Sequence, residues 1–159
     1  MRIRGGRDDR KRRAGSAVVE FALAFPVLVA LCLGVIETGN LFFSWLTVQK
    51  AATMGTRLAT TGLGWDDGTR LTRIRSEVAR LLENLPGEGE SQTLVQSWDT
   101  TNTSGEPRDE NAGLPCDVVA VKVLYAYRPI TPIVGSLMPE IIPLAGEDRK
   151  INEPWLPCD

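Results

Sequence analysis

The feature that most constrains this chain is an apolar segment that directly follows a cluster of basic residues. Seven basic and two acidic residues lie within positions 1–15, and the run from Phe21 to Ile36 then contains no charged side chain. As a helix, this run spans about 24 Å, and continuing the helix through Phe43 exceeds the roughly 30 Å of a hydrocarbon core. The segment is therefore long enough to cross a membrane.

The distribution of charge favours one role for the basic residues. The rest of the chain carries eleven basic and eighteen acidic residues, so a net positive charge is found only at the start. Such an arm can bind nucleic acid, contact a membrane surface or hold the end of a spanning helix in the cytoplasm. We favour the anchor because the apolar run follows directly. No interleaved aromatic residues support nucleic-acid binding, so we expect no nucleic-acid partner.

A cleavable secretory signal begins in the same way as a membrane anchor. However, Glu37-Thr38-Gly39-Asn40 follows the apolar run, where a secretory signal would have a small-x-small cleavage site. Apolar residues also continue at helical spacing through Leu41, Trp45, Val48 and Ala52. The sequence predicts one helix from about Ser16 to about Thr60, with its first half in lipid or protein and its second half packed on a domain. Pro26 is expected to kink or loosen it.

Glu20 stands out because it places a carboxylate at the start of the apolar segment. An ionised carboxylate at membrane depth costs on the order of 2.5–3.5 kcal/mol unless it finds a partner. Cutting the chain after Gly15 would create one, because the new amine of Ser16 is positively charged. In an assembly, the amine of one subunit and Glu20 of the next would neutralise each other. The alternative is that Glu20 lies near the lipid headgroups and is solvated.

The sequence beyond the long helix predicts a second, amphipathic helix. A glycine-rich joint at 62–68 ends the first helix. Apolar residues then recur at helical spacing over 69–85, and Pro86-Gly87 ends the pattern. The basic residues of this stretch are expected to form a solvated face: Arg70, Arg73, Arg75 and Arg80.

The remaining residues predict a small sheet. Strands are expected over 92–98 and, most clearly, over 117–127, where apolar residues alternate, with a long exposed loop at 99–113 between them. Pro129 and Pro132 end the second strand. Residues 140–144 and 147–151 are expected to form a last strand or strand pair. The expected fold class is α+β, with an amphipathic helix packed on a short antiparallel sheet as a head on a helical stalk.

The cysteines allow two interpretations. Cys116 and Cys158 each lie in the context Leu-Pro-Cys-Asp, and in a compartment outside the cytoplasm we expect them to form a disulfide. Closing that loop would stabilise the fold by about 3–4 kcal/mol in the chain-entropy treatment. The alternative is two free or buried thiols. Cys32 is read as a small apolar residue of the long helix.

The residue types present disfavour catalysis. The chain contains no histidine, which is the commonest general base and metal ligand near neutral pH. It also lacks a nucleophile elbow, a glycine-rich phosphate loop before a helix and a cluster with metal-ligand spacing. We therefore expect no catalytic residue, no cofactor and no metal site, and we do not expect an enzyme.

Two motifs at the start of the chain resemble a known family. Basic residues followed by Gly15, Glu20 and Phe21 are similar to a type IV prepilin leader, the class III signal that prepilin peptidases cut. The continuation through residues 17–26 and 34–40, and then 48–52 and 55–59, resembles TadE-like proteins of Tad (Flp) pilus systems. The sequence departs from that pattern at Asn40, where a basic residue is expected, and near Thr53-Met54.

The resemblance implies a pseudopilin or minor pilin that takes part in Tad pilus assembly and hence in cell adhesion. Its domains would be a basic leader at 1–15, a helix at 16–61 that spans the membrane in its first half, and an extracytoplasmic head at 62–159. Cleavage would fall between Gly15 and Ser16, with Glu20 and Phe21 as assembly contacts.

The implied location is the bacterial cytoplasmic membrane, crossed once, with the N-terminus inside. The implied partners are the membrane, a prepilin peptidase, other pilins or pseudopilins and Tad inner-membrane platform proteins. Glu37 and Asn40 would contact another helix or mark the outer lipid interface. The competing reading is an unprocessed single-pass membrane protein with an extracytoplasmic binding or sensing domain.

Overall fold

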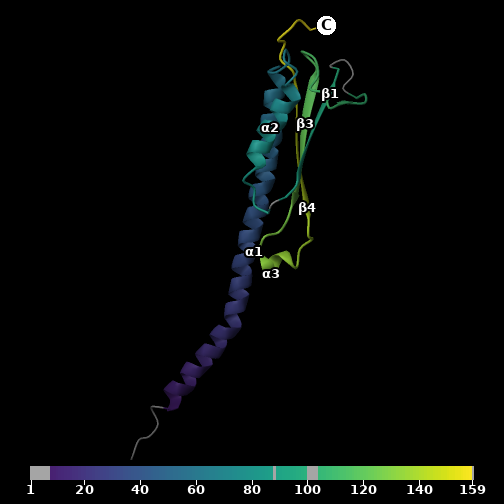
Figure 1. Cartoon of the computed structure of the whole chain (residues 1–159). Coiled ribbons are helices and arrows are strands. Elements are labelled where there is room, and N and C mark those ends of the chain that lie inside the picture. The colour runs from purple at the N-terminus through teal and green to yellow at the C-terminus, as the bar shows by residue number, and fades with distance from the viewer. Residues whose placement is uncertain (1–7, 88, 100–103, 159) are drawn as a thin grey trace, which may run out of the picture.

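The computed structural model describes residues 8–87, 89–99 and 104–158, and it consists of one long helix with a small head along its C-terminal half (Figure 1). The long helix α1 spans Asp8–Thr60, and the second helix α2 spans Arg70–Leu82. A third, single-turn helix α3 spans Pro132–Gly135 at the end of the head nearest the N-terminal half of α1. The expected α+β class is confirmed.

Helix α1 begins earlier than predicted and is not interrupted at Pro26. Its first residue is Asp8, so part of the expected basic leader continues the helix, while residues 1–7 lie outside the described residues. Acidic residues in the first turn favour a helix through its dipole, and the arginines, lysine and alanine that follow are strong helix formers. Figure 1 shows the N-terminal part of α1, in purple, bending away from the axis of the rest, as expected for a helix that contains a proline.

Four antiparallel strands form one sheet in the order β2-β1-β3-β4. Their bounds are Ser91–Trp98 for β1, Arg108–Asp109 for β2, Val118–Tyr127 for β3 and Ile142–Ile151 for β4. The predicted strands at 92–98 and 117–127 are confirmed. The predicted loop at 99–113 contains the two-residue strand β2, which the irregular sequence there did not reveal.

The last part of the sheet is one strand where the sequence left a pair open. Pro143 and Gly146 made the boundary ambiguous, yet β4 runs through both and pairs with β3 from Ile142 to Ile151. Because β4 is an edge strand, one side of it needs no ladder donors, so a proline is tolerated there. Gly146 lies opposite Val123 in the register and faces α1.

Helices α1 and α2 pack on one face of the sheet through a single core. Val48, Ala51, Ala52 and Ala59 of α1 are fully buried. Alternate residues of β3 complete the core with residues of α2 and of the neighbouring strands: Ile74, Val78, Leu82, Val95, Val119, Val121, Val123, Tyr125, Tyr127 and Leu144. The alternation predicted for this strand therefore places one of its two faces in this core.

Small residues on α1 allow the helix to lie close to its neighbours. A Cβ atom added at Gly55 would lie 2.8 Å from Val78 of α2 and 3.1 Å from Val121 of β3. At Gly146 of β4, an added Cβ would lie 2.7 Å from the carbonyl oxygen of Val48 on α1. The helix backbone and the edge strand are thus in direct contact.

The contact between α1 and β4 also contains hydrogen bonds. The Gln49 side-chain amide donates to the Ala145 carbonyl at 2.8 Å, and the Thr56 hydroxyl lies 3.1 Å from the Asp148 carbonyl. Exposed strand edges invite pairing with other chains. Here part of the edge is covered by the helix of the same molecule.

We predict that Gly146→Ala destabilises the head by about 1–3 kcal/mol, because the new methyl group meets backbone atoms of α1 that cannot rotate away. Thermal unfolding of the full chain in detergent, followed by circular dichroism, measures the change. Gly39→Ala on α1 is the matched control, since nothing lies within 4 Å of its added Cβ. Equal melting temperatures for the two variants would contradict the close contact.

Candidate functional site

The N-terminal half of α1 carries its apolar side chains on every side. Large apolar residues from Val18 to Ile36 are exposed, and Leu23 and Val35 are about three-quarters exposed. Segment Ser16–Thr60 is long and apolar enough to cross a membrane, and none of its most apolar window is buried inside the structure. A helix that is apolar all round needs an apolar surrounding. This half of α1 is therefore consistent with a membrane anchor.

The predicted processing residues lie at the start of this exposed segment. Gly15 is within α1, so cleavage after it would leave Ser16 as the first residue of the helix. The Ser16 hydroxyl donates to Oε1 of Glu20 at 3.0 Å, and both residues are exposed. The carboxylate thus faces back toward the N-terminus of the shortened helix.

Phe21 follows Glu20 on the exposed surface of α1. Its side chain is 64% exposed, and its ring centroid lies 5.5 Å from that of Phe25, one turn further along. The two rings form an apolar surface beside the carboxylate. Glu20 therefore stands next to exposed apolar side chains, which is the environment in which an unpaired carboxylate is costly.

Glu37 lies at the junction between α1 and the head. Its side chain is 1% exposed and is held by donors from the head. The Tyr127 hydroxyl donates to Oε1 at 2.6 Å, and the Thr131 backbone N–H donates to Oε2 at 2.8 Å. The Ile130 backbone N–H lies 3.1–3.2 Å from both oxygens. Charge-assisted bonds of this kind are stronger than neutral ones.

The local sequence explains why these donors converge. Tyr127 is the last residue of β3 and lies on its buried face, which points toward α1. Pro129 ends the strand and Pro132 begins α3, so the intervening N–H groups of Ile130 and Thr131 are free of the sheet ladder and available to an anion. Burial, and then the hydrogen bond to Glu37, raise the pKa of Tyr127, which keeps the phenol protonated as a donor.

From the sequence, we predicted that Glu37 contacts another helix or marks the outer lipid interface. The carboxylate is enclosed by the head of its own chain and is not presented to a neighbour. Asn40, one turn further along, is half-buried on α1. The alternation of β3 places Tyr127 on the face that meets α1, but the sequence carries no sign that its hydroxyl contacts Glu37, 90 positions earlier in the chain.

A second buried polar group joins the far end of α1 to the head. Arg70, expected on a solvated face, is instead 6% exposed and donates to the carbonyl oxygens of Ala59 at 2.7 Å and Gly113 at 2.6 Å. Its guanidinium stacks on the Trp155 ring at 4.6 Å. Burial lowers the pKa of Arg70 to about 10, opposed by the nearby charge of Asp117, so the side chain stays cationic at neutral pH.

The cysteines of the head lie at the same end. Cys116 and Cys158 are joined in the structure, with their Cα atoms 5.8 Å apart, within the usual range for a disulfide. The bond ties the C-terminal tail to the loop before β3, while Cys32 is free and exposed on α1. Asn152, in the same region, donates to the carbonyls of Ala112 and Leu114 at 2.8 Å.

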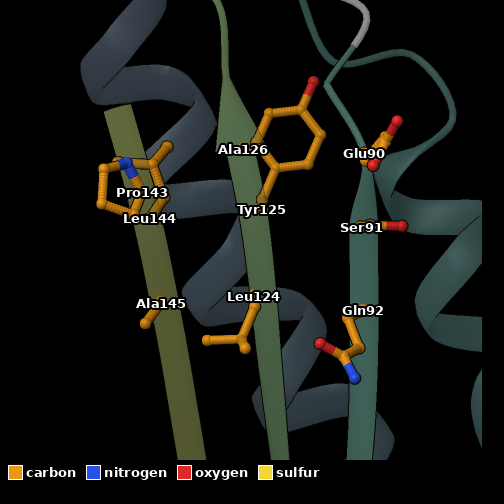
Figure 2. Close-up of a pocket in the computed structure, with 9 residues that line it drawn as sticks. All are labelled: Glu90, Ser91, Gln92, Leu124, Tyr125, Ala126, Pro143, Leu144 and Ala145. Carbon is orange, nitrogen blue, oxygen red and sulfur yellow. The ribbon is translucent and has the colours of Figure 1, made fainter. Parts of the chain in front are cut away.

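The head has a groove at one end of its sheet. Figure 2 shows its lining, which comes from the ends of β1, β3 and β4 and contains Glu90, Ser91, Gln92, Leu124, Tyr125, Ala126, Pro143, Leu144 and Ala145. The Tyr125 hydroxyl already makes hydrogen bonds within the protein: it accepts one from the Gly89 N–H at 3.0 Å and donates one to the Pro86 carbonyl at 3.3 Å. Among the described residues, no group of three potential metal ligands is found.

We predict that Tyr127→Phe destabilises the docked head by about 1–3 kcal/mol, because it removes a donor from a buried carboxylate. Glu37→Gln should weaken the same contact, and the double variant should cost less than the sum of the two single ones. Denaturant unfolding of the full chain in detergent measures all three. Tyr125→Phe is the control, since its hydroxyl bonds neutral groups, and its effect should add independently to that of Glu37→Gln.

Comparison with known proteins identifies one family over the first helix. Residues 15–57 match the family described as TadE-like protein, and the match begins at Gly15. No curated protein and no solved structure matches the chain. The matched segment contains the exposed apolar half of α1, Glu20, Glu37 and the small residues that pack on the sheet. The family suggests a structural rather than a catalytic protein. Residues 15–57 of this chain are a TadE-like family domain.

Proposed function

We propose that this protein is a pseudopilin or minor pilin of a Tad (Flp) pilus system that a prepilin peptidase cuts between Gly15 and Ser16. The observation that carries the proposal is the start of the exposed apolar helix, where Ser16 and Glu20 lie one turn apart and in contact. The TadE-like match over this segment supports it. The head would lie outside the cytoplasm, as the basic N-terminal residues favour.

Cleavage would convert a membrane anchor into a helix with a charged end. The eight residues Asp8–Gly15 would be removed from α1, a length of about 12 Å. The remaining helix would begin with the amine of Ser16, a positive charge at the end where the helix dipole is itself positive. A carboxylate one turn into the helix offsets that unfavourable placement, and Glu20 occupies this position.

In an assembly, Glu20 would pair with the Ser16 amine of a neighbouring subunit. Within one chain, Oε1 accepts from the Ser16 hydroxyl, and the carboxylate remains exposed to a second molecule. Two opposite charges that meet in an apolar interior attract more strongly than they would in water. The exposed rings of Phe21 and Phe25 would contribute apolar contact area around that pair. Other pilins and the Tad platform proteins of the membrane are the expected partners.

We predict that the mature protein begins at Ser16. Mass spectrometry of the protein purified from membranes should detect the N-terminal peptide that starts there. Gly15→Val should retain the leader, because the added side chain prevents close approach of a peptidase to the backbone. Gly34→Ala is the control, since its added Cβ meets nothing within 4 Å, and it should be processed normally. A mature N-terminus at Met1 would instead support the unprocessed membrane protein.

We predict that Glu20→Ala inserts normally and is processed, but is incorporated into pilus-associated complexes at a level reduced about tenfold or more, as for the loss of a charge pair worth about 1.4 kcal/mol or more. Crosslinking in membranes and recovery in sheared fibres measure incorporation. Ser16→Ala is the matched control, because it removes the hydroxyl bonded to Glu20 but keeps the amine. Normal incorporation of Glu20→Ala would rule out the proposed amine–carboxylate pair.

A further inference from the structure

The end of the head that lies beside Glu37 has an uncharged, apolar surface. From Pro129 to Pro139 the sequence contains no ionisable side chain, with Arg128 before this stretch and Glu140 after it. Leu137 is 83% exposed, the highest value among the large apolar side chains of the described residues. Ile130 and Ile141 are about half exposed. We call residues 129–139 the proximal segment, and the exposed Glu140 follows it.

The proximal segment is fixed at a defined height along α1. The N–H groups of Ile130 and Thr131 bond the Glu37 carboxylate, so the segment is attached where the apolar run of α1 ends. The turn continues in α3, whose Gly135 N–H donates to the Thr131 carbonyl at 2.7 Å, and the Leu137 N–H donates to the Val134 carbonyl at 3.0 Å. Figure 1 shows α3 at the tip of the head that faces the N-terminal half of α1.

The thickness of a membrane places the level of Glu37 on α1 at the lipid boundary. A hydrocarbon core of about 30 Å takes about 20 helical residues, and counting that number back from Ile36 reaches Ala17. If the aromatic residues Phe42, Phe43 and Trp45, which are exposed on α1, instead mark the outer interface, Glu37 lies below that interface. Both alignments bring the proximal segment to the outer lipid surface or into it.

We propose that the proximal segment inserts into the outer leaflet of the membrane that α1 crosses, as a second, shallow membrane contact of the head. The inference requires α1 to span the membrane but does not require processing at Gly15. The surface continues the exposed apolar surface of α1, and a lipid boundary is the surrounding that an uncharged segment with an exposed leucine favours. Arg128 is exposed beside it and can reach the phosphate groups of lipids.

The contact would also account for the burial of Glu37. A carboxylate at the lipid boundary is costly unless donors enclose it. The proximal segment supplies two backbone donors to Glu37 while presenting Ile130 and Leu137 outward. The same turn would therefore shield a charge from lipid and hold the head against the membrane.

Spin-label accessibility of the full chain tests the proposal. A nitroxide is attached to Leu137→Cys in a Cys32→Ser background, and the protein is reconstituted in phosphatidylethanolamine–phosphatidylglycerol vesicles at low protein density. Leu63→Cys is the water-exposed reference, because Leu63 lies about 35 Å from the level of Glu37 in the direction of the α1 C-terminus. Leu31→Cys is the reference for a label in lipid. Because Leu137 is so exposed, its substitution should leave the fold intact, and circular dichroism of each labelled variant verifies this.

The expected result is that a water-soluble nickel chelate collides with the label at 137 about tenfold less often than with the label at 63, while oxygen reaches it freely. Such a ratio corresponds to a transfer preference of about 1.4 kcal/mol for the apolar phase. If the nickel chelate reaches the label at 137 as often as the label at 63, the inference is overturned. A label at 31 that is still protected by lipid would then show that the membrane anchor itself holds. Protection from both reagents would indicate a protein contact and would also overturn it. A nickel-accessible label at 31 would overturn the anchor and the inference together.

Discussion

The direct packing of α1 against the sheet is the contact on which the head depends. Gly55 and the buried alanines of α1 let its backbone approach α2 and β3, and Gly146 lets β4 touch the helix. Because interiors are close-packed, a larger side chain at any of these positions would move the helix away from the whole sheet. The C-terminal half of α1 is thus an element of the core, while the large apolar side chains of its N-terminal half are exposed in the described part of the chain.

Glu37 lies where these two halves of α1 meet and where the surroundings of the helix change. On the N-terminal side of Glu37 the side chains are exposed and apolar, and on its C-terminal side one face of the helix is buried in the head. The donors from Tyr127, Ile130 and Thr131 make a carboxylate acceptable at this position. At the opposite end, Arg70 bonds the carbonyl of Ala59 and stacks on Trp155, so a buried charge fixes each end of the docked helix.

Periodicity predicted the longer elements of this fold, but it did not predict the two-residue strand β2 or the polar contacts. The helix α2 and the strand β3 were recognised because burial repeats along each of them, at 3.6 and 2 residues. The partners of Glu37 are 90 or more positions away in the chain, and those of Arg70 are backbone carbonyls, so neither pattern is visible in local spacing. Strand β4 could not be predicted as one strand because a proline within it is tolerated only if the strand lies at the edge of the sheet. Which strand lies at the edge is known only once the whole sheet is known.

The contact of α1 with β4 sets the order in which the head can form. Gln49 and Thr56 of α1 bond carbonyls of β4 that are 96 and 92 positions later in the chain. The part of the α1 packing face that meets β4 therefore stays uncovered until β4 has been synthesised, and local contacts cannot complete the core beforehand. Folding of the head thus has to follow synthesis of β4 and, in a membrane-spanning chain, also its transport.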